Sequence, residues 1–304
     1  MLSKLVSTQK YLFNTARTIS NVRNAHSRCI YNYGLPTYYC SNLKPQQEET
    51  NTIVTERTKT AGELILADFA LGRFITNVYS ATGGGIAASL AIAKLVSMAS
   101  LAATPIPITI GALMSFSGVF TFHSTGSELT YKQVEGKTVP YVKPSFARQL
   151  SYFAIYTGNG LMLSKLVLAA NLVNPAIIPM SIALTALTFG GASLYAYNKP
   201  LGSFSKYGGF LSGGLLGLIG MSLMSGVSYL IMGPTPLSMA FWRIEPYIAI
   251  AVFSGLIGHD THQAVENYKP GDYDHFKPAV LMYYNVITIF TNYIHILLRF
   301  YTKK

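Results

Sequence analysis

The sequence GLIGHDTHQ, residues 255–263, ends a long apolar stretch with an aspartate beside two histidines. A carboxylate in such a setting is costly unless another group pairs with it, so Asp260 is the first candidate for a functional group. The histidines leave two interpretations open. Either His259, His262 and the distant His295 hold a metal ion together with Asp260, or they form hydrogen bonds to water, lipid headgroups or Asp260. Only His259 and His262 share a helical face, so we favour hydrogen bonds and expect no metal.

Motifs for catalysis are missing elsewhere in the sequence. There is no nucleophile elbow, phosphate-binding loop, His-Glu-x-x-His or pair of catalytic carboxylates, so we expect no enzymatic activity. Asp272 and Asp274 lie in a glycine-containing turn that supplies too few oxygen ligands for calcium, and we expect both to be solvated. Cys29 and Cys40 are expected to be free thiols rather than a disulfide, since nothing marks the chain as secreted.

The elements that must position Asp260 are membrane helices. Half of the 304 residues are hydrophobic and only 12% are charged, which excludes an ordinary soluble domain. A helix crosses a bilayer with about 20 apolar residues. We therefore predict an all-α, polytopic membrane protein, and not a β-barrel, whose short alternating segments are missing. Residues 62–73 are expected to form an amphipathic surface helix. The seven predicted spans are 74–103, 105–123, 146–170, 175–198, 207–232, 237–260 and 277–300.

Residues 1–60 are predicted to be a targeting segment and linker, followed by the membrane domain at residues 61–304. The first 47 residues contain six Lys or Arg and no acidic residue, a composition typical of a mitochondrial presequence. A disordered basic tail is the alternative. Basic residues also gather in the loops on this side of the bundle, which predicts that the N-terminal side faces the matrix. The net charge of +11 fits anionic lipids such as cardiolipin better than nucleic acid, and we expect no other cofactor.

Two further features lie inside the spans. Gly209, Gly213 and Gly217 recur every four residues, forming a ridge that lets helix backbones approach closely in lipid. We favour packing inside the monomer over an oligomer interface. Lys165 lies toward the far end of the third span, where a lysine can extend its ammonium to the membrane surface; a role in an ion pathway is the alternative.

The last fifty residues resemble a known family. An apolar helix, His-Asp-Thr-x-Gln, a Tyr-Lys-x-Gly-Asp-Tyr-Asp turn and an aromatic helix ending Leu-Leu-Arg-Phe look like the carboxy-terminal signature of the transmembrane Bax-inhibitor-motif family. Two earlier stretches, GRFITNVYSATGGG and TALTFGGASLYAYNKPLGSFSKYGGFLSGGL, resemble its first, fourth and fifth helices, so the resemblance covers residues 72–300. The basic tail suggests the branch of the mitochondrial inner membrane.

The resemblance implies seven helices, with the last surrounded by the other six, and a calcium or proton leak gated by two facing aspartates. Two such carboxylates in a medium of low dielectric share one proton, so pH opens or closes their contact. The first aspartate matches Asp260, but Asn285 stands at the place of the second. An amide cannot share a proton, although it can donate a hydrogen bond to Asp260. The basic residue expected near the end of the second helix is also missing, since that stretch offers only His123.

Two functional hypotheses of different classes follow. The first is a non-enzymatic structural or assembly subunit of a larger complex of the mitochondrial inner membrane, with a respiratory complex as the obvious host. The altered position 285 and the missing basic residue motivate it. The second is a calcium or proton pathway, motivated by Asp260 and the overall resemblance. We favour the first, with inner-membrane subunits and anionic lipids as partners, because a shared fold rarely fixes function.

Overall fold

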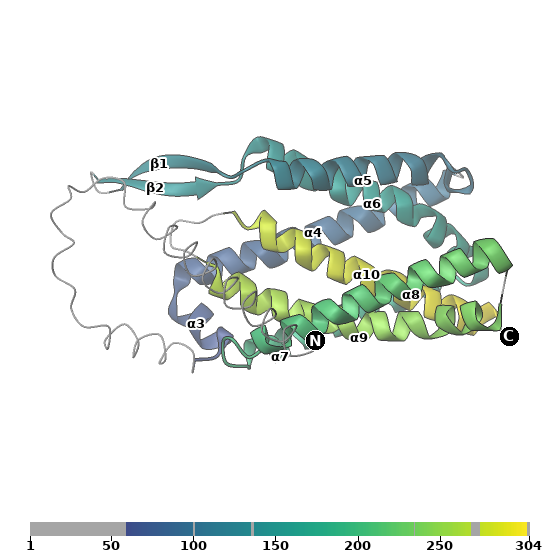
Figure 1. The fold of residues 1–304 in the computed structure, drawn as a ribbon. Coiled ribbons are helices and arrows are strands. Elements are labelled where there is room, and N and C mark those ends of the chain that lie inside the picture. The colour runs from purple at the N-terminus through teal and green to yellow at the C-terminus, as the bar shows by residue number, and fades with distance from the viewer. Residues whose placement is uncertain (1–58, 100, 135–136, 234, 269–273, 303–304) are drawn as a thin grey trace, which may run out of the picture. The chain divides into compact units, whose positions relative to one another are not determined.

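The computed structural model describes residues 59–99, 101–134, 137–233, 235–268 and 274–302 (Figure 1). All described elements belong to one compact unit, Val54–Lys304. The predicted targeting segment, apart from its last two residues, lies outside the described part, as do Cys29 and Cys40. Those interpretations therefore stay predictions.

Within the described residues, seven helices are long and apolar enough to cross a membrane. This confirms the prediction of an all-α, polytopic membrane protein. A 3₁₀ turn, η1 (Leu101–Ala103), lies between the first and second of these membrane-length helices, and a second 3₁₀ turn, η2 (Ser205–Tyr207), precedes the fifth. The spans are α4 (Phe69–Met98), α5 (Ile106–Ser124), α6 (Phe146–Val173), α7 (Ile177–Tyr197), α8 (Gly208–Met232), α9 (Pro236–Glu266) and α10 (Phe276–Thr302).

The predicted surface helix at residues 62–73 is divided in two by Asp68. The first part is α3 (Ala61–Ala67), which begins with a capping box between Thr60 and Glu63. The Asp68 carboxylate then accepts a hydrogen bond from the backbone N–H of Ala70 at 2.8 Å. Because this carboxylate satisfies free N–H groups at a helix start, α4 begins at Phe69, five residues before the predicted span.

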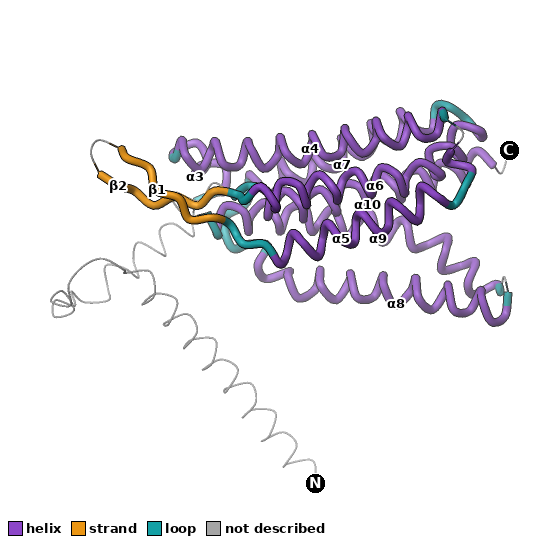
Figure 2. The backbone as a smooth tube through the Cα atoms, turned by 90° about the horizontal axis from the view of Figure 1, so that it is seen from above, coloured by secondary structure: helices purple, strands orange, loops and turns teal. Residues whose placement is uncertain are grey.

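The segment 124–145, which was expected to be a loop, contains a β-hairpin (Figure 2). Strand β1 (Glu128–Val134) pairs antiparallel with β2 (Lys137–Lys143), with Thr130 opposite Tyr141. The two strands are local neighbours in sequence, so the hairpin forms without a partner from elsewhere in the chain. It connects the end of α5 to the start of α6.

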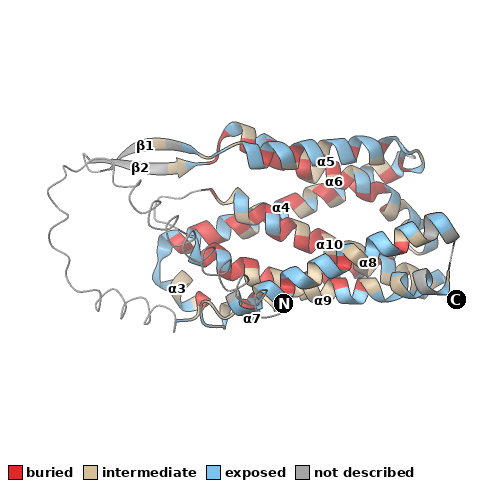
Figure 3. Cartoon of the chain, viewed as in Figure 1, coloured by how far each residue is buried: buried red, intermediate tan, exposed pale blue. Residues whose placement is uncertain are grey.

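The last helix, α10, is the centre of the core. Half of the residues in its apolar stretch are buried, against at most 39% in any other span (Figure 3). Tyr283, Ile289 and Ile294 of α10 are fully buried. The helix packs against α4, α6, α7 and α9, whereas α5 packs mainly on α6 and α8 mainly on α9. The last helix is therefore central, but four helices line it closely and two lie outside.

Close packing of small residues holds α6 between α5 and α4. A Cβ atom on Gly158 would lie 2.5 Å from the Gly111 carbonyl oxygen and 2.6 Å from the Ser115 nitrogen of α5. On another side of the same helix, a Cβ on Gly160 would lie 2.8 Å from the Ser89 carbonyl oxygen of α4. Such contacts between backbones supply van der Waals attraction in a solvent that gives helices little hydrophobic drive to associate.

We predict that Gly158→Ala destabilises the protein in detergent by about 1–3 kcal/mol, because the added methyl group must push α5 away from α6. Thermal unfolding followed by circular dichroism measures the change. Gly190→Ala is the matched control, since a Cβ at Gly190 of α7 meets no atom within 4 Å. Equal melting temperatures for the two variants would contradict the close approach of α5 and α6.

Candidate gate in the helix bundle

Asp260 of α9 and Asn285 of α10 meet inside the bundle. The Asn285 amide nitrogen Nδ2 donates a hydrogen bond to Asp260 Oδ2 at 2.6 Å. The two residues are 8% and 7% exposed. The structure thus brings together the two positions that the resemblance aligns with a facing pair of acids, and it joins them by one short hydrogen bond.

The depth of Asp260 differs from the sequence prediction, which placed it at the end of the sixth span. Helix α9 continues to Glu266, so Asp260 lies about 9 Å inside the helix end. Asn285 follows the start of α10 by nine residues, or about 14 Å. The predicted boundary was too early because the last turns of α9 carry polar residues that nevertheless face other helices. The pair therefore lies within the membrane-spanning part of the bundle.

Two residues that follow Asp260 form hydrogen bonds from α9 to α4 and α7. His259 Nδ1 lies 3.4 Å from Asp260 Oδ1, whereas Thr261 Oγ1 lies 2.9 Å from the Tyr79 hydroxyl of α4. His262 Nε2 lies 2.8 Å from the Ala196 carbonyl oxygen near the end of α7; because a carbonyl only accepts, Nε2 carries the hydrogen and donates this hydrogen bond.

His262 is buried among protein groups, whereas we expected the histidines to bond water, lipid headgroups or Asp260. It is 2% exposed, and its ring meets Phe204 edge-on with ring centres 4.8 Å apart. His259 is more exposed and lies near Gly208 at the start of α8. Among the residues that the structure describes, no three His, Cys, Asp or Glu side chains come close enough to hold a metal ion.

Polar residues continue from the pair along one side of α10. They are three or four positions apart and so share one helical face, opposite the buried face that contains Tyr283 and Phe290. We call this the polar face of α10. His295 is exposed and lies about 15 Å along the axis from Asn285, so it does not contact the pair. The members of the polar face are Asn285, Thr288, Asn292, His295 and Arg299.

Lys165 and the three α8 glycines lie elsewhere. Lys165 is exposed on α6 and forms no ion pair within the described part of the chain. The expected packing of Gly209, Gly213 and Gly217 inside the monomer is wrong, since a Cβ on each would meet no atom within 4 Å. The four-residue spacing correctly placed the three glycines on one face of α8 but could not show whether another helix covers that face.

Other residues attach α8 to α9. A Cβ on Gly255 would meet a Leu211 methyl at 2.7 Å, and one on Gly214 would meet Val252 at 3.1 Å. Ser222 donates a hydrogen bond to Glu245 of α9. The ridge of glycines therefore lies on the side of α8 away from α9.

Sequence reasoning missed a buried ion pair near the start of the core helix. Arg148 Nη1 lies 2.7 Å from Asp274 Oδ2, and the Ser127 hydroxyl bonds both groups. The guanidinium lies 4.6 Å from the centre of the Phe122 ring. Arg148 and Asp274 are 9% and 7% exposed. This cluster joins the end of α5, the start of α6 and the residue two positions before α10.

Two expectations change with this cluster. Asp274 is buried and paired rather than solvated, while Asp272 lies outside the described residues. The last turns of the second helix contain no Lys or Arg, yet Arg148 of α6 reaches the Phe122 ring at the end of that helix. The sequence did contain signals for this ion pair. Arg148 lies in the first turn of the apolar helix α6, and Asp274 lies just before α10. Each charge needs a partner near lipid.

Seven membrane-length helices in the described part of the chain, one of them a core helix that contributes to an acid–amide pair, define a polytopic, all-α membrane protein. A family model described as inhibitor of apoptosis-promoting Bax1 matches residues 71–301, which is most of the chain. The chain therefore belongs to the Bax inhibitor family.

Similar proteins come from animals and from a bacterium. Bax inhibitor 1 of Mus musculus is 29% identical over 141 residues, or 46% of this chain and 55% of that protein. Bax inhibitor 1 of Homo sapiens is 28% identical over 148 residues, or 49% of this chain and 58% of that protein. An uncharacterized protein of Caulobacter vibrioides is 24% identical over 229 residues, or 75% of this chain and 86% of its own length. The match thus spans little more than half of the two Bax inhibitor 1 proteins.

We predict that Arg148→Met destabilises the protein by about 3–5 kcal/mol, because it leaves the Asp274 carboxylate buried without its cation. Arg148→Met combined with Asp274→Leu is expected to recover much of the loss. Lys165→Met removes a cation from the exposed side of the same helix and is the control, with a change within about 0.5 kcal/mol. Urea titration in detergent measures all three. Similar losses for Arg148→Met and Lys165→Met would rule out the ion pair as a structural support.

Proposed function

We propose that this protein is a non-enzymatic structural or assembly subunit of a larger complex in the mitochondrial inner membrane, a respiratory complex being the natural host. The hydrogen bond from Asn285 to Asp260 carries this proposal. In a pair of facing acids, one proton decides whether the contact is attractive or repulsive. The Asn285 amide does not titrate, so it holds the contact in one state.

An amide instead of an acid at position 285 also weakens cation binding at the pair. A divalent cation favours several oxygen ligands and negative charge, and the pair offers a single carboxylate. One oxygen of that carboxylate already accepts the Asn285 N–H group at 2.6 Å. A cation at Oδ2 would compete with this hydrogen bond, and it would meet the amide oxygen of Asn285 only after that side chain turned over. The arrangement suits a permanent helix contact better than a gate.

Surfaces left uncovered in the monomer support a partner. The polar face of α10 contains the exposed His295 and the half-buried Asn292, and hydrocarbon is a poor solvent for such groups. The α8 ridge is smooth enough for another helix to approach its backbone closely. Subunits that cover these two surfaces would satisfy the polar groups and add packing that the chain itself does not supply.

The proposed location rests on charge. The N-terminal segment is basic and lacks acidic residues over 47 positions. Lys199, Lys206 and Arg148 lie at the same ends of the helices from which that segment enters the bundle. This distribution suits import into mitochondria and a matrix-facing N-terminal side, where anionic lipids such as cardiolipin would attract the lysines.

A calcium or proton pathway is the second candidate, and one observation favours it. Asp260 is a buried carboxylate, and from its partner Asn285 the polar face of α10 runs toward the opposite end of the helix. Polar residues in that order would suit an ion that moves along α10.

Reconstitution into liposomes separates the two candidates. We expect little calcium flux through the purified wild-type protein, because its pair offers one carboxylate held by an amide. Asn285→Asp restores the second acid and is expected to raise the flux at least tenfold, with a dependence on pH that the wild type lacks. A calcium-sensitive dye inside the vesicles reports the flux.

Asn292→Asp is the matched control, since it makes the same chemical change seven residues further along α10 without touching Asp260. Asn292→Asp is expected to leave the calcium flux as low as in the wild type. Wild-type flux that disappears in Asp260→Ala would overturn the structural role and establish the pathway.

Assembly has its own test on native gels in mild detergent. We expect the wild-type protein to migrate in a complex far larger than its 33.1 kDa chain. Gly213→Leu with Gly217→Leu should release it, because the added side chains stand on the open ridge and disturb only a partner. Gly190→Leu with Gly191→Leu, two open positions on α7, is the control. Migration of the wild type as a lone chain would defeat the proposal.

A further inference from the structure

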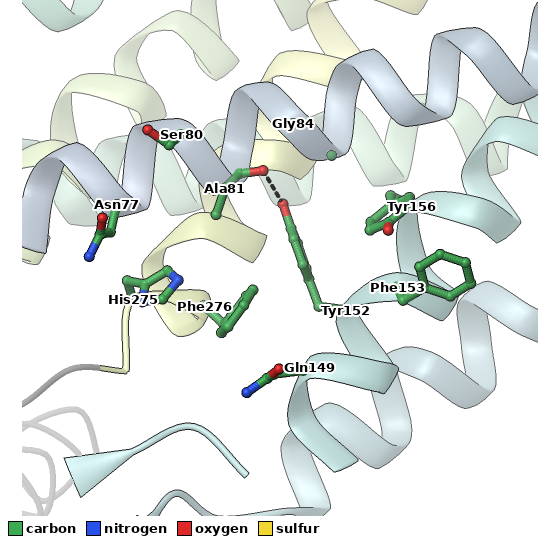
Figure 4. Close-up of a pocket in the computed structure, with 11 residues that line it drawn as sticks. Asn77, Ser80, Ala81, Gly84, Gln149, Tyr152, Phe153, Tyr156, His275 and Phe276 are labelled. Carbon is green, nitrogen blue, oxygen red and sulfur yellow. Dashed lines mark hydrogen bonds between the residues drawn. The ribbon is translucent and has the colours of Figure 1, made fainter. Parts of the chain in front are cut away.

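A pocket of about 710 Å³ lies between α4, α6 and the start of α10 (Figure 4). This volume is within the range of roughly 300–1,000 Å³ that small-molecule sites occupy. Asp260 and Asn285 do not line it, so it is separate from the candidate gate. Its walls differ in chemistry from one end to the other.

One end of the pocket is polar and without fixed charge. Asn77 and Ser80 of α4, Gln149 of α6 and His275 before α10 gather there (Figure 4). Asn77 and Ser80 are exposed within a membrane-spanning helix, where hydrocarbon would leave their amide and hydroxyl groups unsatisfied. The Asn77 amide and the Ser80 hydroxyl can donate hydrogen bonds to an acceptor, and the Gln149 amide, which donates to the Pro144 carbonyl oxygen at 3.4 Å, has a second hydrogen to donate.

The other end is aromatic and apolar. Phe153 and Tyr156 of α6 lie there with ring centres 5.1 Å apart, opposite Gly84 of α4. A Cβ on Gly84 would meet no atom within 4 Å, so the missing side chain leaves space in the pocket. Between the two ends, the Tyr152 ring lies 5.2 Å from that of Phe276, and its hydroxyl donates to the Ala81 carbonyl oxygen at 2.8 Å.

The two ends lie at different depths in the membrane. Asn77 follows the start of α4 by eight residues, or about 12 Å, and Gly84 lies about 10 Å deeper along the same helix. His275 and Gln149 lie at or within one turn of the starts of α10 and α6, on the same side of the bundle. Polarity therefore falls with depth, as it does along a membrane lipid with its head at the surface.

We propose that this pocket binds a neutral isoprenoid lipid with a flat head and carbonyl acceptors, the chemistry of a quinone. The amide and hydroxyl donors of Asn77, Ser80 and Gln149 suit carbonyl oxygens, and the aromatic rings of Tyr152 and Phe276, which line the pocket, suit a flat head. An anionic phospholipid is disfavoured because none of the lining residues is Lys or Arg, the side chains that bind phosphate. The aromatic end and the gap at Gly84 receive the tail.

The test uses the full-length protein in phosphatidylcholine nanodiscs and a photoreactive azido derivative of a short-chain ubiquinone. We expect mass spectrometry to find the label on α4 and α6 around Ser80 and Tyr156. Decylubiquinone should compete with the label, whereas cardiolipin at the same concentration should not. Gly84→Leu fills the pocket and is expected to weaken competition by decylubiquinone at least tenfold.

Gly83→Leu is the matched control, because its Cβ also meets no atom within 4 Å but the residue does not line the pocket. It should leave the affinity unchanged. Asn77→Leu keeps the pocket open and removes one donor, so it decides the matter if Gly84→Leu fails to fold. Equal labelling of wild type and Asn77→Leu, or displacement of the quinone by cardiolipin, would overturn the proposal. The outcome is independent of whether the protein conducts calcium or joins a complex.

Discussion

Hydrocarbon offers no hydrogen-bond partner, and this constraint decides how the polar groups of the seven helices are arranged. Asp260 is held by Asn285, and Arg148 is held by Asp274 and Ser127. The Ser89 hydroxyl bonds the Gly85 carbonyl of its own helix at 2.9 Å and also lies 2.7 Å from the Tyr283 hydroxyl of the core helix. Each of these contacts joins one helix to another part of the bundle, so the groups that are most costly to bury also help to determine how the bundle is assembled.

An amide at position 285, where the resemblance implies an acid, can keep a fold while changing its chemistry. Asn and Asp side chains are nearly equal in size, and Asn285 contacts α9 beside Val286 and Ile289 of the core helix. Unlike a carboxyl group, the amide cannot hold a proton. Proteins of one fold can therefore differ in the property that a pH-sensitive gate requires while their helices stay the same.

The helices were predictable from the sequence because length and the absence of charge suffice to identify a span. Their ends were harder to place, since caps such as Asp68 and inward-facing polar turns such as Thr261 and His262 extend helices beyond the apolar stretch. The resemblance placed Asp260 and Asn285 at matching positions. It gave no sign of the cluster around Asp274, whose partner Ser127 is 147 residues away. The spacing of the glycines revealed the α8 ridge but not what covers it, because periodicity describes a single helix whereas packing depends on the helix beside it.

A short bridge between Thr60 and Pro200 fixes the start of the described part of the chain. The Leu201 N–H group bonds the Lys59 carbonyl at 3.2 Å, and the Ala61 N–H group bonds the Lys199 carbonyl at 3.3 Å. These two hydrogen bonds hold the start of α3 against the turn that follows α7. A chain cut just upstream of Lys59 would keep these hydrogen bonds, so its new N-terminal residues would stay docked against the turn after α7.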